Sequence, residues 1–385
     1  MSDRREIPFG RPSLTPDDRR AVLEVLDGHI LTHGPQCKAF ETEFAAFMGE
    51  GAHAVTVSSC MAALHLACLQ LGFGPGDDVL VAAQTHVATA HAVEWTGARP
   101  VFVDCDPCTG NVTAERIEAA ITARSKGLLL VHFVGIPCDM PGIMAVAKRH
   151  GLAVVEDCAI ATGARYEGRH VGLFGDAGCF SFYPVKHMTT AEGGMFVSRH
   201  REIVDKVARL RAFGVDRTYG ERTLPGLYDV PTLGLNYRMS ELQAALGRSQ
   251  LRRMPESLER RRRSFHALRD AIASLDDFGV IDATDRNAVS SHYCCTVRLR
   301  GRWMGRRNEF VRALNAEGIG TSVHYPQPVP RMTYYQRKYG YEPAAFRGAE
   351  AISDGTFALP VAPHVGDDDV AYMIATITRL AEELV

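Results

Sequence analysis

The sequence predicts an α/β fold: a large domain with a mostly parallel sheet flanked by helices, and a smaller α+β domain at the C-terminal end. Helical and strand-like patterns alternate from Phe40 to about Val197 without an internal repeat. Such alternation is typical of a parallel sheet with helices on both faces. The chain has 385 residues, of which 46% are hydrophobic, so it can bury a large core and ordinarily forms two domains. We place these at residues 1–245 and 246–385.

Taken in order, the elements begin with an amphipathic helix from Pro16 to Asp27 and a loop at 30–35. Further predicted elements are strands at 127–135, 152–155 and 179–183, and helices starting near residue 60 and at 140–150 and 201–214. Residues 215–235 are polar and contain glycine and proline, which indicates a mobile loop over the site. A helical run at 239–275, interrupted at Pro255, leads into the smaller domain. That domain is predicted to contain a strand at 292–300 and helices at 306–318 and 367–380.

The charges are balanced, with 43 basic and 45 acidic side chains and a formal net charge of −2. No net field therefore draws the chain to nucleic acid or to an anionic membrane surface. Residues 1–10 lack the apolar core of a signal peptide, and no segment approaches the ~18 apolar residues of a membrane helix. These features predict a cytoplasmic protein without nucleic-acid or membrane partners.

Ten cysteines are scattered along the chain, a distribution that favours reduced thiols. Cys105 and Cys108 form one C-x-x-C pair. A zinc site needs two more ligands at matching spacing, and a distant residue such as Cys138 could at most start a second pair. We therefore predict no metal site.

Lys186 lies between an aromatic-rich strand and the glycine pair Gly193 and Gly194. A tight, irregular loop of this kind holds an amine in place. An amine must be neutral to attack an aldehyde, and burial beside an apolar or cationic group favours that form. The pattern suits a lysine that forms a Schiff base. The alternative is a solvated lysine in a surface hairpin, because most lysines are exposed.

A short apolar strand from Leu152 to Val155 is followed by Glu156 and Asp157, some thirty residues before the lysine. Ligands of open α/β sheets bind at the carboxyl ends of the strands. A carboxylate there could keep the pyridine nitrogen of pyridoxal phosphate protonated, so that the ring accepts electrons. Asp157 is the candidate for this role. Its alternative role is the N-cap of a following helix.

Two further segments complete the predicted site. Ser58 and Ser59 precede the helix that begins near Cys60, and a helix N-terminus of this kind binds anions. A plain serine N-cap is the alternative. His86 follows a strand at its carboxyl end, where a flat ring could cover a flat cofactor. A structural or surface histidine is the alternative at that position.

These segments together resemble the pyridoxal phosphate-dependent aminotransferases of fold type I, and within them the sugar aminotransferase family named DegT/DnrJ/EryC1/StrS. The resemblance extends from LTHGPQCKAFETEFAAFMG, at residues 31–49, to FALPVAPHVGDDDVAYMIATI, at residues 357–377. It implies a mostly parallel seven-stranded sheet in the large domain, pyridoxal 5'-phosphate as the cofactor, and transfer of an amino group.

The resemblance also implies roles for residues around the cofactor. Lys186 matches the lysine that bonds covalently to the cofactor, Asp157 the acid on the pyridine nitrogen, and His86 the residue that stacks on the cofactor face. Ser181 and the turn Ser59–Cys60–Met61 match the phosphate cup.

Residues further from the cofactor ring match the family as well. Asn236, in GLNYRMSELQAALG, matches an asparagine that reaches the phosphate of the neighbouring subunit, which implies a homodimer with shared active sites. His324 and Tyr325 look like the substrate-side pair of the family. The alternative for these two is a simple strand end before Pro326.

Two positions depart from the family pattern. The phosphate turn reads Ser59–Cys60–Met61 where the family has Ser-Gly-Thr, so backbone N–H groups must hold more of the anion. Ile160 stands where the family has a glutamine that bonds the cofactor's ring hydroxyl, which puts one cofactor contact in doubt. The family's dehydratase branch replaces the lysine by histidine, so the presence of Lys186 favours transamination.

The sequence therefore predicts transfer of an amino group, from L-glutamate, to a keto group of a nucleotide-linked or otherwise activated sugar. The run PVKHMTTAEGG, at residues 184–194, is closest to members that aminate C4 of nucleotide-linked keto sugars. One alternative is the same chemistry on a different keto sugar, a cyclitol or a small keto acid. Another is a non-catalytic regulatory or structural member of the fold, which loss of Lys186 or Asp157 would mark.

Overall fold

The computed structural model describes residues 5–49, 51–217, 224 and 226–384. Its α-helices are α1 (Pro16–Leu26), α2 (Pro35–Met48), α3 (Cys60–Gln70), α4 (Val87–Glu94), α5 (Ala114–Ala120), α6 (Met140–His150), α7 (Arg201–Leu210), α8 (Glu241–Arg252), α9 (Met254–Ile272), α10 (Arg307–Ala316), α11 (Thr333–Tyr339), α12 (Arg347–Gly355) and α13 (Asp367–Glu383). Its strands are β1 (His53–Val57), β2 (Asp78–Ala82), β3 (Arg99–Val103), β4 (Ser125–Val131), β5 (Ala153–Asp157), β6 (Arg165–Tyr166), β7 (Arg169–His170), β8 (Ala177–Ser181), β9 (Gly194–Ser198), β10 (Phe278–Val280), β11 (Ala288–Val289), β12 (Cys295–Leu299) and β13 (Thr356–Leu359).

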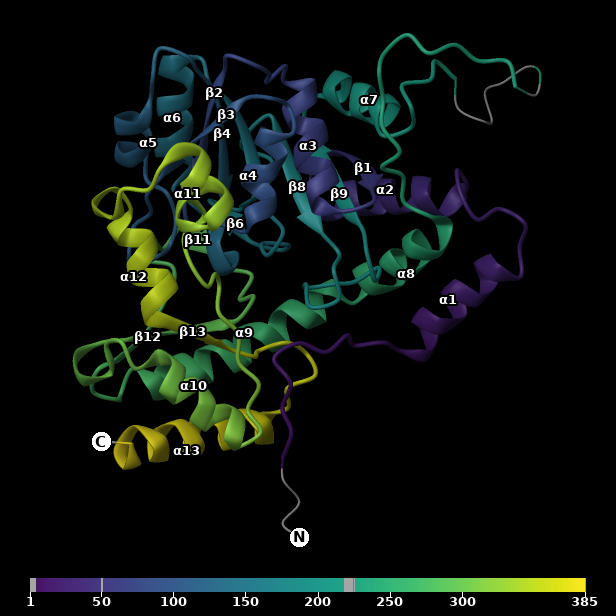
Figure 1. Cartoon of the computed structure of the whole chain (residues 1–385). Coiled ribbons are helices and arrows are strands. Elements are labelled where there is room, and N and C mark those ends of the chain that lie inside the picture. Colours follow the sequence, from purple (N-terminus) through teal and green to yellow (C-terminus); the bar gives the residue numbers. More distant parts are fainter. Residues whose placement is uncertain (1–4, 50, 218–223, 225, 385) are drawn as a thin grey trace.

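A seven-stranded sheet in the order β1-β9-β8-β5-β4-β2-β3 forms the centre of the larger part of the molecule (Figure 1). The strands β8, β5, β4, β2 and β3 are parallel. The strand β9 is antiparallel to both of its neighbours. The predicted mostly parallel seven-stranded sheet is confirmed.

Successive side chains of a strand point to opposite sides of the sheet, and in this sheet both sides are buried. On β2, Val79 and Val81 pack in the core cluster that includes α3 and α4. Leu80 and Ala82 pack in a different cluster, which includes α5 and α6. Burial on both faces explains why the strands read as continuous apolar runs.

A separate antiparallel sheet, β10-β12-β13, lies in the C-terminal part and confirms the predicted smaller α+β unit. Its core includes Phe265 of α9, Phe310 of α10 and Ile377 of α13. The predicted boundary between residues 245 and 246 falls inside α8 and stays a prediction. No helix within the described ranges is long and apolar enough to cross a membrane.

Several predicted element ends differ from the structure. The strand expected at 127–135 ends at Val131, because Val134 adopts a left-handed backbone (φ 46°) in a short 3-10 helix. The helix expected at 201–214 ends at Leu210, and Ala212 instead forms an isolated bridge with residue 236. The run at 239–275 breaks at Arg253, between α8 and α9, rather than at Pro255. Pro255 lies in the first turn of α9, where a proline is tolerated. The strands expected at 152–155, 179–183 and 292–300 are 153–157, 177–181 and 295–299.

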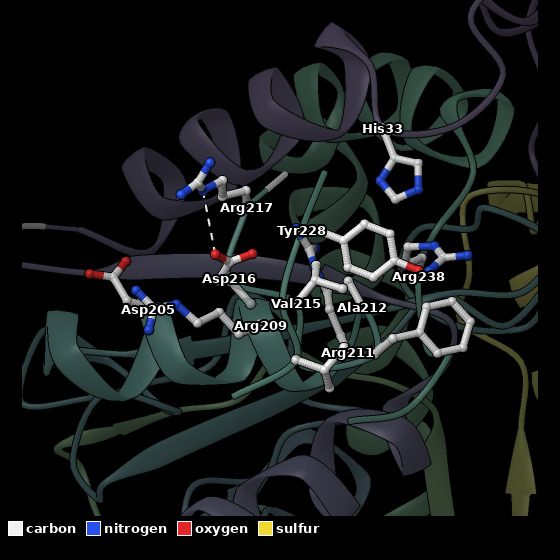
Figure 2. Close-up of a pocket in the computed structure, with 13 residues that line it drawn as sticks. His33, Asp205, Arg209, Arg211, Ala212, Val215, Asp216, Arg217, Tyr228 and Arg238 are labelled. Atoms are coloured by element: carbon white, nitrogen blue, oxygen red, sulfur yellow. Dashed lines mark ion pairs between the residues drawn. The ribbon is translucent and has the colours of Figure 1, made fainter. Parts of the chain in front are cut away.

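The segment 215–235, expected as a mobile loop over the site, is described except for residues 218–223 and 225. Figure 1 shows the described part of this segment beside α7. The N–H of Asp216 donates to the carbonyl of Asp229 at 2.9 Å. The described residues of the segment 215–235, together with α7, line a cavity of about 800 Å³, which Figure 2 shows. Within this chain the described part of the segment therefore lies against α7.

Candidate active site

Asp157 ends β5 and is 3% exposed. The Thr89 hydroxyl donates to Oδ2 at 2.7 Å, and the backbone N–H of Ala159 donates to Oδ1 at 3.0 Å. Thr89 also lies within hydrogen-bonding distance, 2.8 Å, of the Thr85 hydroxyl. Turns rather than a helix follow β5, so the N-cap alternative for Asp157 does not apply. These bonds hold the carboxylate in one orientation.

Lys186 lies in a turn after β8, where its N–H donates to the carbonyl of Tyr183 at 2.9 Å. Burial lowers the pKa of the Lys186 amine, although the nearby Cys60 and Asp157 oppose that shift. The Nζ atom lies 5.4 Å from the centre of the Tyr293 ring. Lys186 is thus a half-buried residue whose amine is shielded from solvent, so it is not the solvated lysine of a surface hairpin. Its surroundings favour the neutral form that nucleophilic attack requires.

The helix α3 begins at the turn predicted to bind phosphate. Ser59 is its N-cap, and the Ser59 hydroxyl accepts from the N–H of Ala62 at 3.1 Å. Cys60 and Met61 form the first turn, where backbone N–H groups have no partner within the helix. The serine is thus an N-cap, as the simpler interpretation holds, and the same helix end retains donors for an anion.

Gly194 allows the strand that carries Ser181 to lie close to this turn. Ser181, at the end of β8, pairs with Gly194 at the start of β9. Gly194 lies so close to α3 that an added Cβ would be 2.6 Å from the carbonyl carbon of Ser59 and 2.7 Å from the nitrogen of Cys60. A residue with a side chain could not approach in this way. The Ser181 hydroxyl and the N-terminus of α3 therefore lie on neighbouring elements.

Three aromatic residues form a wall near Lys186 and Asp157. His86 caps α4, since its Nδ1 accepts from the N–H of Ala88 at 3.2 Å, and its ring centre lies 5.7 Å from that of Tyr325. Burial lowers the pKa of His86 and lowers the pKa of His324 to about 3. Burial raises the pKa of Tyr325 well above its usual value. Both imidazoles are therefore neutral, and the phenol is protonated.

Ile160 is fully buried in an apolar cluster that includes Phe133, Tyr293 and Cys294. Its side chain contributes an apolar surface three residues after Asp157. Its own carbonyl accepts from the hydroxyl of Ser291 at 3.3 Å. An amide side chain at this position would lie among apolar neighbours.

Asn236 follows the segment beside α7 and bridges to Ala212 through the backbone. The next residue, Tyr237, accepts through its carbonyl from the N–H of Ser58 at 2.8 Å. Asn236 is thus anchored close to the α3 turn of its own chain. Its predicted contact with a partner subunit stays a prediction.

Sequence reasoning missed two residues of this site. Thr89 binds Asp157 directly, and Tyr293 lies under the lysine amine. Thr85 and Thr89 are four residues apart, on either side of His86. This spacing is a sequence signal that could have indicated Thr89. Tyr293 has no local signal, because it comes from the small-domain side of the chain.

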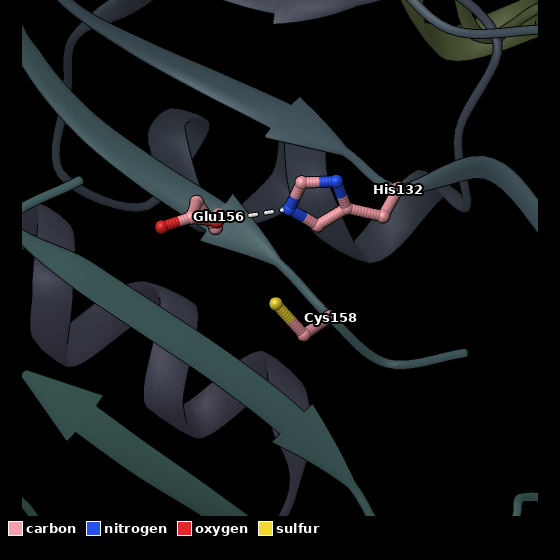
Figure 3. Close-up of side chains that lie close together, drawn as sticks. All are labelled: His132, Glu156 and Cys158. Carbon is pink, nitrogen blue, oxygen red and sulfur yellow. Dashed lines mark hydrogen bonds and ion pairs between the residues drawn. The ribbon is translucent and has the colours of Figure 1, made fainter. Parts of the chain in front are cut away.

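His132, Glu156 and Cys158 are the one group of potential metal ligands in the described residues (Figure 3). The Nδ1 of His132 accepts from the N–H of Cys138, so its Nε2–H donates to Glu156 at 2.9 Å. Burial raises the pKa of the Cys158 thiol well above its usual value, so it is not a thiolate. Both ring nitrogens of His132 and both carboxylate oxygens of Glu156 have hydrogen-bond partners within the chain, so these residues form a buried hydrogen-bonded network.

The site as a whole fits a cofactor that carries a phosphate and a pyridine ring. The α3 turn with Ser181 supplies anion donors, Asp157 supplies a fixed carboxylate, and Lys186 supplies a buried amine. Neutral aromatic rings flank the space between them. A cofactor with a phosphate and a pyridine ring accounts for each of these features.

Comparisons with known proteins agree with this geometry. Residues 12–378 match the DegT/DnrJ/EryC1/StrS aminotransferase family. The chain is 38% identical to the spore coat polysaccharide biosynthesis protein SpsC of Bacillus subtilis, covering 98% of this chain and 97% of that protein. It is 38% identical to a UDP-N-acetyl-3-dehydro-α-D-glucosamine 3-aminotransferase of Acidithiobacillus ferrooxidans, covering 93% and 92%. The crystal structure of DesV from S. venezuelae in complex with a ketimine intermediate is similar, with a TM-score of 0.88, 34% identity and coverage of 95% and 94%.

Proposed function

Because the chain belongs to the DegT/DnrJ/EryC1/StrS aminotransferase family, we propose that it transfers an amino group from L-glutamate to a keto group of a nucleotide-linked sugar. Sugar aminotransferase activity follows from the family, and so does pyridoxal phosphate, since similar solved structures include pyridoxal phosphate and pyridoxamine phosphate forms. The donor, the nucleotide and the position aminated are the proposal. The observation that carries it is that Lys186, Asp157 and an anion-binding helix end meet in one buried site.

The cofactor, when bound, supplies an electron sink for the carbon that gains or loses a proton. Asp157, held by Thr89, would keep the pyridine nitrogen protonated. The Lys186 amine would accept and return the proton that this carbon loses or gains, because burial lowers the pKa of the amine and favours its neutral form. The N–H groups of Cys60 and Met61, with the hydroxyls of Ser59 and Ser181, would hold the phosphate. His86 would cover the ring, and Ile160 stands at the position nearest the ring hydroxyl.

The substrate side would be formed by His324 and Tyr325. The Tyr325 phenol stays protonated, so it can donate a hydrogen bond to a sugar oxygen. The backbone here is held in place, because the Nε2 of Gln84 donates to the His324 carbonyl at 3.0 Å. Neutral donors of this kind suit the hydroxyl and carbonyl oxygens of a sugar.

The cavity beside α7 supports the nucleotide part of the proposal. Four arginines and two acids line it, with Arg217 paired to Asp216 at 3.4 Å (Figure 2). The other arginines are Arg209, Arg211 and Arg238, the other acid is Asp205, and the half-exposed rings of Phe213 and Tyr228 complete the lining. The Arg238 guanidinium lies 4.8 Å from the centre of the Phe213 ring. Guanidinium groups bind phosphates, and aromatic rings stack on bases.

The same cavity connects with the proposed dimer. Arg238 is two residues from Asn236, so an Asn236 that reaches the partner's phosphate would place this cavity beside the partner's site. The working unit in this proposal is a homodimer whose two sites are each completed by the other protomer. A nucleotide diphosphate linked to the keto sugar would then lie between the protomers.

The keto group aminated is C4 in our proposal, on the resemblance of residues 184–194. A C3 keto group is the second candidate. The similarity to the Acidithiobacillus ferrooxidans protein, which is named as a 3-aminotransferase of a 3-dehydro sugar, favours it.

A single-turnover panel tests these assignments. The enzyme, converted to its pyridoxamine phosphate form, is mixed with nucleotide-linked 4-keto sugars, nucleotide-linked 3-keto sugars, free keto sugars and keto cyclitols. We expect the pyridoxamine absorbance to be lost with a nucleotide-linked keto sugar and to persist with the free sugar. Loss with a cyclitol alone would replace the substrate class, and no loss with any ketone would support a non-catalytic member. Reloading with L-glutamate, and not with L-alanine, tests the donor.

A further inference from the structure

Gln84 is a fully buried amide that follows β2 and lies two residues before His86. Its side chain is 0% exposed, whereas glutamine is usually found on the surface. Its Nε2 donates to the carbonyl of His324, 240 residues away, at 3.0 Å. Its Oε1 accepts from the hydroxyl of Ser353, on α12, at 2.9 Å. The side chain therefore joins three parts of the chain that lie far apart in the sequence.

The orientation of the Gln84 amide follows from its two partners. A backbone carbonyl only accepts hydrogen bonds, whereas a serine hydroxyl can donate or accept. The NH2 group must therefore face His324, and the amide oxygen receives the hydroxyl of Ser353. A reversed amide would place two oxygen atoms against each other at His324. Because buried polar groups need partners in any protein, this bond alone is compatible with a purely structural role.

The segment 322–329, which carries the predicted substrate pair, crosses from the small antiparallel sheet to the seven-stranded sheet. Its first residue forms an isolated bridge with β13 of the small sheet. The N–H of its last residue donates to the carbonyl of Ala83, at the end of β2, at 2.9 Å. Gln84 binds the segment between these two points. Its hydrogen bond therefore determines how closely the middle of the segment approaches the end of β2.

The middle of this segment faces the residues predicted to contact the cofactor. The ring centre of Tyr325 lies 5.7 Å from that of His86. The ring centre of His324 lies 5.4 Å from that of Tyr293, the aromatic residue beside the Lys186 amine. A displacement of the His324 backbone would thus move two rings relative to the lysine and to the cofactor site.

We propose that Gln84 is a positioning residue for the sugar: by holding the His324 carbonyl, it sets the distance of His324 and Tyr325 from the cofactor. This inference rests on the proposed function, because it takes these two residues to contact the keto sugar. Gln84 acts through the backbone of the pair and is not itself a catalytic residue. One buried side chain thereby connects the substrate pair to the strand end that carries His86.

Crystal structures of the parent protein and of Gln84→Met, both loaded with pyridoxal phosphate, test the positioning directly. Methionine is similar in length and cannot donate to a carbonyl. We expect the His324 carbonyl to move away from residue 84, and the ring centres of Tyr325 and His86 to lie further apart than 5.7 Å. The bond between Thr89 and Asp157 should keep its length. An unmoved backbone at His324 and Tyr325 in Gln84→Met would overturn the proposal.

Ser353→Ala is the matched control, because it removes the other hydrogen bond of the amide and leaves the donor to His324 in place. Both variants should lower the melting temperature. In single turnovers of the pyridoxamine phosphate form, Gln84→Met should need roughly 2–10-fold more nucleotide-linked keto sugar for half-maximal rate. Ser353→Ala should match the parent in this measurement. Equal shifts in the two variants would identify a purely structural role and overturn the proposal.

Gln84→Glu is a variant of the same shape whose donor depends on pH. Only the protonated carboxyl group can donate to the His324 carbonyl. The half-saturating sugar concentration of this variant should therefore approach the parent value as pH falls. A ratio to the parent that stays raised at every pH would overturn the proposal. If the parent aminates no nucleotide-linked keto sugar, the proposed function fails, and the crystal structures still decide whether Gln84 positions the pair.

Discussion

Glu156 and Asp157 are neighbours on β5, and their surroundings differ. Glu156 accepts from the Nε2–H of His132 at 2.9 Å and from the backbone N–H groups of residues 172, 174 and 175 at 2.7–2.8 Å. Asp157 accepts from one hydroxyl, one N–H and, weakly at 3.8 Å, the Cys60 thiol, and it lies near the Lys186 amine. A carboxylate has about four acceptor sites, so Glu156 is saturated and Asp157 retains capacity for a ligand.

This contrast arises from strand geometry. Consecutive side chains of a strand point to opposite faces, so one acid joins the packing on one side of the sheet and the other faces the site. Two carboxylates at the carboxyl end of a parallel strand are thus not equivalent candidates. The number of donors that each receives from the protein distinguishes them.

The largest expected effect is on the Asp157 side of the strand, at the lysine. Lys186→Ala should lower turnover by at least roughly 10²–10⁴-fold, because the proton-transferring amine is lost, while the fold and cofactor binding remain. Borohydride reduction of the parent protein should attach the cofactor to Lys186, as peptide mass spectrometry can show. Attachment to another lysine would remove the assignment. Lys126→Ala, at an exposed lysine, is the matched control.

Asp157→Asn is expected to lower turnover by about 10²-fold or more, because the amide cannot keep the pyridine nitrogen protonated. It should cost under about 1 kcal/mol of unfolding free energy, since an amide oxygen can still accept from Ala159. Steady-state kinetics and denaturant unfolding measure the two effects. Full turnover in this variant would show that the two acids do not differ in the way we infer.

Glu156→Gln should show the opposite pattern. An amide replaces one accepting oxygen by a donor, and each buried N–H left without an acceptor costs roughly 1–3 kcal/mol. The unfolding free energy should fall, while turnover per folded, cofactor-loaded site stays close to that of the parent. A loss of turnover without a loss of stability would place Glu156 in the chemistry.

The pH dependence of the unfolding free energy tests the same contrast between Glu156 and Asp157. Burial raises the pKa of Glu156, but hydrogen bonds from His132 and from the N–H groups of Gly175 and Gly172 outweigh it, and the net pKa lies below the usual 4.5. A lowered folded-state pKa stabilises the protein fully above the unfolded-state value and progressively less as pH falls through the folded value. The stability difference between parent and Glu156→Gln should therefore narrow below about pH 4.5.

A variant of Asn236 tests whether a second protomer completes the active site beside Asp157. Asn236→Ala and Lys186→Ala proteins are each expected to be impaired alone. In a mixed dimer, one site receives both lesions and the other neither, so random mixing should restore about one quarter of the parent activity. Formation of mixed dimers is verified with differently tagged chains. No recovery in verified mixed dimers would exclude shared sites.

The smallest expected effect is at Ile160. Ile160→Gln buries an amide among apolar side chains, at a cost of roughly 1–3 kcal/mol if it finds no partner. We expect the dissociation constant of pyridoxal phosphate to be unchanged or weaker. Cofactor binding several-fold tighter than in the parent would show that the site lacks a contact rather than having been rebuilt around an apolar wall. Ile160→Leu keeps the apolar wall and is the control.

The sequence alone predicted the α/β alternation, the parallel sheet, the start of α3 at Cys60 and the span of α6. These features depend on neighbours a few residues away, such as a serine N-cap or a run of β-branched residues. It also predicted Lys186 and Asp157 as candidates, because the residue types and the family resemblance agreed. Ends of elements were less certain, since a bridge such as Ala212 to Asn236 can stop a helix before its local pattern does.

The tertiary structure decided which groups meet. Thr89 and Asp157 are 68 residues apart, Gln84 and His324 are 240 apart, and His132 and Glu156 are 24 apart. No local pattern encodes these contacts, because each arises where the sheet and the two parts of the chain pack together. The distinct roles of two adjacent acids, and the fixed orientation of the Gln84 amide, therefore follow from packing: burial and the partners it supplies determine what a carboxylate or an amide can do.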